Sequence, residues 1–192
     1  MTAPQSTRPA RQQTEFPPVP GIEYQRSELN IPIVANGEVK EIVKMTAVLE
    51  LDRGAPVTNA GGHRQFEFAI KTWEVAGYSE FLQEWVTITL SSTPQPRSLA
   101  IAQTAAADYP AIIVYNAIFD VYVGRRQVAA QVTGLGVGVE AYEVPPSVSI
   151  QFQKAFPLGE GIEASAGACD EEASLTVEEF RAQAAEFTAI RG

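Results

Sequence analysis

VKEIVKMTAVLEL, residues 39–51, alternates apolar and polar side chains, with Ile42 and Val48 as exceptions. Successive side chains of a strand point to opposite faces of its sheet, so this period of two predicts a strand with one buried and one wet face. The same pattern recurs over residues 66–70 and 113–123. Few helical stretches separate these segments, which argues against parallel βαβ units. The sequence therefore predicts an all-β domain.

The connections between these segments predict how the strands are joined. Asn36-Gly37 lies between two alternating segments, and this dipeptide suits the positive φ angles of a tight hairpin turn. Gly124 and the two arginines after it predict a second hairpin. We expect about eight long strands over residues 22–158, forming an antiparallel β-sandwich, with a β-barrel as the alternative architecture.

The two ends of the chain differ from this domain in composition. Residues 1–21 are polar and rich in proline, which predicts an extended or disordered N-terminal arm. Residues 159–174 are small, acidic and glycine-containing, and we expect a flexible spacer there. Residues 175–191 predict an amphipathic helix, with Thr176 and Glu179 as a capping box at its start.

The predicted helix carries one apolar stripe, made by Val177, Phe180, Ala184, Phe187 and Ile190. A lone helix of this length is marginal in water, so its stripe must be buried. Two arrangements satisfy this requirement. The helix can pack back on its own sheet, or it can insert into a groove on another protein, in which case the stripe is a partner-binding surface.

A second candidate for binding is the stretch in which Gly134, Gly136 and Gly138 alternate with other residues. All three glycines fall on one face of a predicted strand and leave its backbone bare. Either an aromatic side chain from a neighbouring strand fills this space, or the face forms a groove for a flat ligand or a partner's side chain.

Composition excludes several classes of function. The net charge of −9 argues against a protein that tracks nucleic-acid phosphates. No apolar stretch reaches the roughly 20 residues that span a bilayer. The first 20 residues lack the apolar region of a secretory signal, and Cys169 is the single cysteine, so we expect a reducing, cytoplasmic location.

Residues for catalysis or metal binding are scarce. His63 is the single histidine, and the acidic neighbours of Cys169 disfavour a reactive thiolate. One histidine and one cysteine cannot form a zinc site of nitrogen and sulfur ligands within one chain. Asp108 and Asp120 are the carboxylates that a carboxylate enzyme would use. We predict no catalytic residues, no metal and no cofactor.

These observations favour a non-enzymatic module that binds another protein or builds an assembly, with its termini as attachment elements. The partner is another protein or a second copy of the chain. The alternative is a β-barrel carrier, or a small-molecule enzyme, whose cavity for an apolar ligand is lined by inward aromatic side chains.

Overall fold

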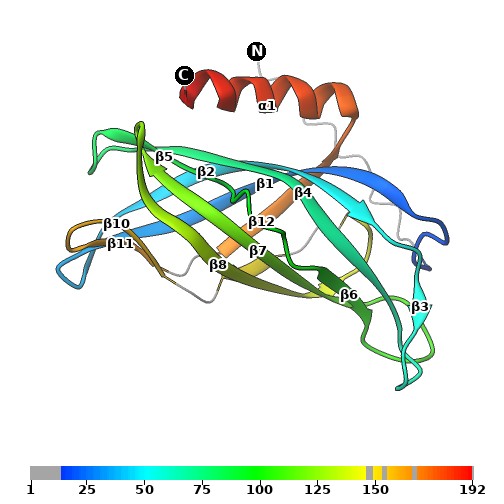
Figure 1. Ribbon diagram of the computed structural model, residues 1–192. Coiled ribbons are helices and arrows are strands. Elements are labelled where there is room, and N and C mark those ends of the chain that lie inside the picture. The colour runs from blue at the N-terminus through cyan, green and yellow to red at the C-terminus, as the bar shows by residue number, and fades with distance from the viewer. Residues whose placement is uncertain (1–13, 146–148, 153–154, 166–167, 192) are drawn as a thin grey trace, which may run out of the picture.

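The computed structural model describes residues 14–145, 149–152, 155–165 and 168–191. In these residues the chain forms twelve strands and one helix (Figure 1). The elements are β1 (Gly21–Ala35), β2 (Glu38–Arg53), β3 (Val57–Thr58), β4 (Arg64–Ser79), β5 (Glu84–Leu90), β6 (Ser98–Ala102), β7 (Ala111–Val123), β8 (Arg126–Ala141), β9 (Ser149–Phe152), β10 (Phe156–Gly159), β11 (Ile162–Ala164), β12 (Ala168–Leu175) and α1 (Val177–Arg191).

The strands form one antiparallel sheet that closes on itself. Pairing runs from β1 through β2, β4, β5, β7, β8, β9 and β12, and β12 pairs with β1 again. Strand β6 shares the position of β5, because both lie between β4 and β7. The prediction of an antiparallel all-β domain is confirmed, and the closed ring of pairings is that of the barrel alternative.

The structure differs from our expectation over residues 159–174, where we predicted a flexible spacer. Strands β11 and β12 lie there, and both pair with β1. Between Tyr24 and Asn30, the backbone groups of β1 that face away from β2 bond to β12. An unpaired edge leaves such groups without partners, so closure of the ring outweighs the weak strand preference of the acidic sequence.

The two ends of the barrel are built differently (Figure 1). One end, the hairpin end, carries the β1–β2, β4–β5, β7–β8 and β10–β11 turns. The first of these has Asn36 at φ 54° and Gly37 at φ 77°, as the dipeptide predicts. At the other end, the arm end, β1 begins and β2 finishes, and the arm (residues 14–20) lies against it.

Side chains of alternate residues fill the interior of the barrel. On β7 the buried positions run from Ala111 to Val121 in steps of two, and the other long strands follow the same rule. Aromatic rings make up much of this inner face; they are Phe16, Phe66, Phe68, Trp73, Tyr109, Tyr115, Phe119 and Phe156. The core therefore lies inside the ring of strands.

Helix α1 packs across the outside of the barrel (Figure 1). Its Phe180 and Phe187 are buried against Val48 of β2 and Ala76 of β4, and the Phe180 ring lies 4.8 Å from the Tyr24 ring. The predicted capping box is confirmed in the bonds between residues 176 and 179. No helix in the described part of the chain is long and apolar enough to cross a membrane.

Candidate functional site

The inner face of β1 changes character halfway along the strand. Toward the arm end its inward residues are Glu23, Gln25 and Ser27, whereas toward the hairpin end they are apolar. Gln25 and Ser27 are each 1% exposed. Since inward positions recur at every second residue, these three side chains form a row, which we call the polar row.

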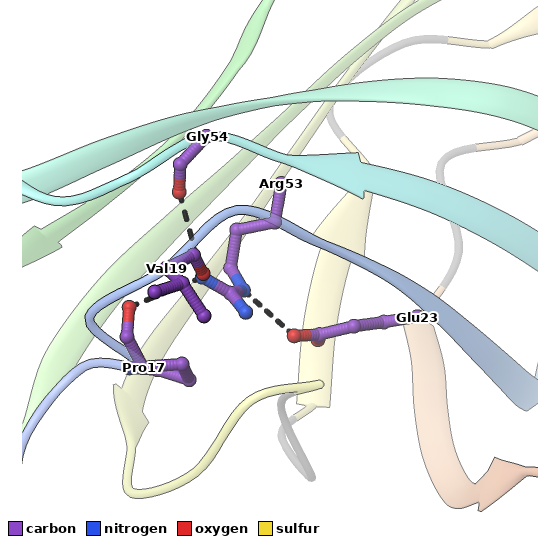
Figure 2. A network of polar contacts seen from close by, with 5 residues as sticks. All are labelled: Pro17, Val19, Glu23, Arg53 and Gly54. Atoms are coloured by element: carbon purple, nitrogen blue, oxygen red, sulfur yellow. Dashed lines mark hydrogen bonds and ion pairs between the residues drawn. The ribbon is translucent and has the colours of Figure 1, made fainter.

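Arg53, the last residue of β2, anchors one end of the polar row (Figure 2). Its Nε donates a hydrogen bond to Oε1 of Glu23 at 2.7 Å. Its Nη1 donates to the carbonyl oxygens of Val19 at 2.7 Å and Pro17 at 3.2 Å. The guanidinium also lies 5.8 Å from the centre of the Phe66 ring, a cation–π distance. This ion pair is buried, with side chains 6% and 13% exposed.

Burial shifts the pKa of two groups at this end. It raises the pKa of Glu23 above its ordinary value, because loss of hydration outweighs the stabilising effect of Arg53. Burial also raises the pKa of Tyr109, and the negative charges of Glu23 and Asp108 add to this shift. The Tyr109 phenol therefore stays protonated at neutral pH and can donate a hydrogen bond.

The rest of the polar row faces β7. The Tyr115 hydroxyl donates to Oε1 of Gln25 at 3.3 Å. The Oγ of Ser27 is buried and has no hydrogen-bond partner among the described residues. Beside the row lies a cavity of about 10 Å³, on the order of the space for one water molecule. The residues that line it are Glu23, Leu51, Arg53, Phe66, Phe68, Ile113, Tyr115 and Val144.

The arm lies against two residues that line this cavity, Arg53 and Phe66. The Phe16 ring is 1% exposed and meets the rings of Phe66 and Tyr109 edge to face, with centroids 5.0 and 5.1 Å away. Its backbone N–H donates to Oδ2 of Asp108 at 2.6 Å. Arg64 contacts the same oxygen through Nη1 at 3.3 Å. Asp108 is thus a buried anchor for the arm.

The other residues considered for chemistry do not line the cavity. Asp120 accepts a hydrogen bond from the Gln131 N–H at 2.8 Å, on the outer side of β7 and β8. His63 precedes β4, and its Nδ1 lies 2.9 Å from the Ala102 carbonyl oxygen. Cys169 lies on β12 opposite Leu29. Within the described residues, no three His, Cys, Asp or Glu side chains gather as a metal site would require.

The three glycines of β8 lie on its buried face, opposite β7. A Cβ atom at Gly134 would lie 2.6 Å from Cε1 of the Phe119 ring. At this position an aromatic ring from the neighbouring strand fills the space, the first of the two arrangements that we considered. A groove at Gly136 and Gly138 stays a prediction.

The apolar stripe of α1 is used, at least in part, within the chain. Phe180 and Phe187 are buried on the barrel wall, whereas Val177 and Ala184 are half-buried. The side chain of Ile190 lies outside the described part of the structure. The helix thus packs on its own sheet, and its use as a partner-binding surface stays a prediction.

Sequence reasoning missed the polar row and Arg53, although the sequence holds a sign of them. Residues 21–35 follow the period of two, and Glu23, Gln25 and Ser27 fall on the same parity as Leu29 and the apolar residues after it. Polar residues at positions that the pattern assigns to the core are unusual. This departure from the pattern is what could have located the site.

Comparison with known proteins finds a similar fold in a solved structure. No family model and no curated protein matches the chain. Among solved structures, the chain is similar to DynF from the dynemicin biosynthesis pathway of Micromonospora chersina. The TM-score is 0.64, the sequence identity is 12%, and the match covers 88% of each chain. At this identity the likeness concerns the fold alone.

Proposed function

We propose that the arm half of the barrel binds a small, mainly apolar molecule that carries one or two polar atoms, and that the protein is a carrier rather than a catalyst. Ligand pockets are typically apolar and aromatic cavities with a few convergent hydrogen-bonding groups. Glu23 of the polar row and Tyr115 line the small cavity together with the rings of Phe66 and Phe68, and Tyr115 bonds to Gln25 on the next inward position, which is such a combination.

The observation that carries this proposal is the Oγ of Ser27. A buried hydroxyl without a partner costs about 1–3 kcal/mol, and an interior with a purely structural role would hold an apolar residue there, as β1 does nearer the hairpin end. A polar atom of a ligand would satisfy this group. Gln25, on the next inward position, would fix the orientation of the same ligand.

The charged groups of this half suit binding better than proton transfer. The Glu23 carboxylate already accepts a hydrogen bond from Arg53, and the Tyr109 phenol stays protonated at neutral pH. The cavity of about 10 Å³ is far smaller than a drug-sized ligand requires. Binding must therefore move part of the surrounding structure, and the arm, which belongs to no strand, contacts Arg53 and Phe66 of the cavity lining.

Two measurements test the proposal. Native mass spectrometry of the protein from its own host should detect a bound small molecule. In a second experiment, Ser27→Ala should weaken binding of a neutral fluorescent naphthalene ketone that carries a dimethylamino group about fivefold, which corresponds to roughly 1 kcal/mol for the lost hydrogen bond from the Ser27 hydroxyl to that nitrogen.

The matched control is Thr87→Val. Thr87 is also buried with an unpartnered hydroxyl, but it lies on the outer side of β5, opposite Ala76, which helix α1 covers. This variant should leave probe binding unchanged. Absence of any co-purified molecule, together with equal effects of the two variants, would contradict the proposal.

A second candidate function is the protein-binding or assembly role expected from the sequence. One observation favours it: Tyr78, Phe81 and Trp85 of the β4–β5 hairpin are 38–44% exposed, and the Tyr78 and Trp85 rings stack edge to face at 5.8 Å. Exposed aromatic side chains are enriched at interfaces. If they mediate self-association, Phe81→Arg should lower the mass observed by sedimentation velocity; an unchanged mass would count against that role.

A further inference from the structure

The arm is held at the mouth of the barrel by contacts of the kind that recognise a ligand. None of residues 14–20 belongs to a strand. Their backbone groups instead bond to barrel side chains. The Phe16 N–H donates to Asp108. The carbonyl oxygens of Pro17 and Val19 accept hydrogen bonds from Arg53, as Figure 2 shows. The barrel thus supplies side-chain donors and acceptors to a short extended segment.

The barrel residues that contact the arm are Arg53, Phe66, Asp108 and Tyr109, and we call them the seat. Only a small part of the arm fills it. The Phe16 ring is enclosed by Phe66 and Tyr109, whereas the Pro18 and Val19 side chains are exposed, Val19 by 64%. The seat therefore accepts one aromatic ring and two carbonyl oxygens. Those are the groups that a competing molecule would have to provide.

The charges around the seat favour an uncharged acceptor. The Arg53 guanidinium is already balanced by the Glu23 carboxylate at 2.7 Å, so it offers N–H donors without net charge. Asp108, with a side chain 5% exposed, is paired in the same way, with Arg64 at 3.3 Å. Both cations at the mouth are thus already balanced, so a ligand carboxylate would bring an extra negative charge without a partner, whereas a ketone, amide or ester oxygen would replace the arm's carbonyls directly.

The seat is continuous with the interior. Arg53 and Phe66 contact the arm, and both also line the small cavity that reaches Tyr115. Removal of the arm would therefore join its seat to the polar row. A molecule lying across both would have its ring and carbonyl at the mouth and its body in the barrel.

We propose that Phe16–Val19 occupies a ligand site at the mouth of the barrel, which we call the head-group site. The ligand that displaces this segment ends in an aromatic ring bearing an uncharged carbonyl group. This inference rests on the proposed function, since it names the chemistry of the ligand bound there. The arm then acts as a resident competitor for this site.

Three matched probes test the chemistry on the full chain. They are 6-propionyl-2-dimethylaminonaphthalene, its analogue without the propionyl group, and the corresponding 6-carboxylate. We expect the ketone to bind at least tenfold more tightly than either analogue. Equal binding of the ketone and the carbonyl-free analogue overturns the head-group site but leaves a binding barrel in place, whereas failure of all three overturns both proposals.

A weakened arm should compete less well. Phe16→Leu keeps an apolar side chain but loses both ring contacts, so the apparent affinity for the ketone should rise about threefold or more as the open fraction grows. Val39→Ala is the control, because Val39 is exposed at the hairpin end of β2, away from the arm, and it should leave that affinity unchanged. An unchanged or weaker affinity of Phe16→Leu contradicts the proposal.

Hydrogen exchange of the unaltered chain tests displacement without any substitution. The Phe16 amide is bonded to Asp108, whereas amides of β7 lie in the sheet. Opening of the arm alone should let residues 14–20 exchange faster than β7, and the ketone should raise their exchange further while it slows that of β7. Arm amides as protected as those of β7, with or without the ketone, would overturn the inference.

Discussion

The two halves of the barrel share the long strands β1, β2, β4, β7 and β8 but are filled in different ways. In the hairpin half, the rings of Trp73, Phe119 and Phe156 pack edge to face, 5.8 and 5.6 Å apart. In the arm half, the polar row and a buried ion pair lie among the aromatic rings. One half is thus packed for stability, while the other holds hydrogen-bonding groups that packing alone does not require.

Polar groups at the hairpin end stabilise a turn at the surface of the protein. Glu41 accepts hydrogen bonds from the Ser79 Oγ at 2.6 Å and from the N–H groups of Glu80 and Phe81 at 3.0 and 3.1 Å, which holds the β4–β5 turn. These bonds lie in part-buried and exposed surroundings. Glu41 and Glu23 are the same kind of residue, and the difference between them is burial. The more exposed glutamate stabilises a turn, whereas the more buried one belongs to the candidate site.

The largest expected effect concerns the two ion pairs of the two ends. Arg53→Met should lower the free energy of unfolding by about 3–5 kcal/mol, because it leaves Glu23 buried without a counter-charge. Lys40→Met removes the partner of Glu38, whose side chain is 75% exposed, and should cost no more than about 1 kcal/mol. Urea unfolding monitored by tryptophan fluorescence measures both.

The double variant Arg53→Met with Glu23→Leu sharpens this result. It removes both charges, so it should recover most of the stability that the single Arg53 variant loses. If Arg53→Met costs no more than Lys40→Met, the two ends do not differ in the way described.

The next effect lies in the hairpin half. Gly134→Ala places a methyl group 2.6 Å from the Phe119 ring carbon, and the resulting strain should cost about 1–3 kcal/mol. Gly159→Ala is the control, because its Cβ would meet Ile162 at an ordinary 3.9 Å. Thermal unfolding should separate the two variants. Gly134→Ala should also leave the naphthalene ketone bound as in the parent, and a loss of binding would show that the halves are coupled.

Much of the fold could be predicted from local patterns. The period of two in residues 39–51 is the strand β2, Asn36-Gly37 is a turn, and Thr176 caps a helix. Each of these depends on residues close in the sequence. Closure of the ring could not be predicted, because it depends on β12 pairing with β1 more than 130 residues earlier, through a segment whose composition is typical of a spacer.

The site was harder to predict for the same reason. Arg53 and Glu23 are 30 residues apart, and Phe16 and Asp108 are 92 apart, so no spacing links them. The proline-rich arm resembles a linker, and only the structure shows Phe16 in the mouth of the barrel. The sequence does place three polar residues, Glu23, Gln25 and Ser27, at positions that the period of two assigns to the core. This indicates which strand carries the site, but it does not indicate which residues of other strands contact it.

A smaller effect should be confined to the outside of the barrel. Thr176→Ala removes the hydroxyl that caps α1 through the Glu179 N–H and should cost about 1 kcal/mol of helix stability. Hydrogen exchange should then rise in α1 and stay constant in β7. An equal rise in both would mean that the helix and the two halves of the barrel unfold together.

The smallest effects are dependences on pH, and the two halves should show opposite signs. Partial burial alone would raise the pKa of Glu41, but the hydrogen bonds from Ser79, Glu80 and Phe81 outweigh it and lower the pKa below its ordinary value of 4.5. A carboxyl group whose folded pKa is lowered contributes stability above its unfolded pKa and loses it as the pH falls through the folded pKa. Relative to Glu41→Gln, the parent should therefore lose stability as the pH drops below about 4.5.

Glu23 should behave in the opposite way, because burial raises its pKa above 4.5 despite the Arg53 charge. The folded state then holds the proton more tightly than the unfolded state, and stability is lost as the pH rises through the folded pKa. Relative to Glu23→Gln, the parent should be most stable below pH 4.5 and lose that advantage toward neutrality. The two slopes of unfolding free energy against pH are measured by chemical unfolding of the parent, Glu41→Gln and Glu23→Gln between pH 3 and pH 7. This interval extends on the order of one unit or more to each side of the ordinary pKa of a carboxyl group. Slopes of the same sign would show that Arg53 lowers the pKa of Glu23 by more than burial raises it. The ionised form of the carboxyl group would then be favoured by folding in both halves.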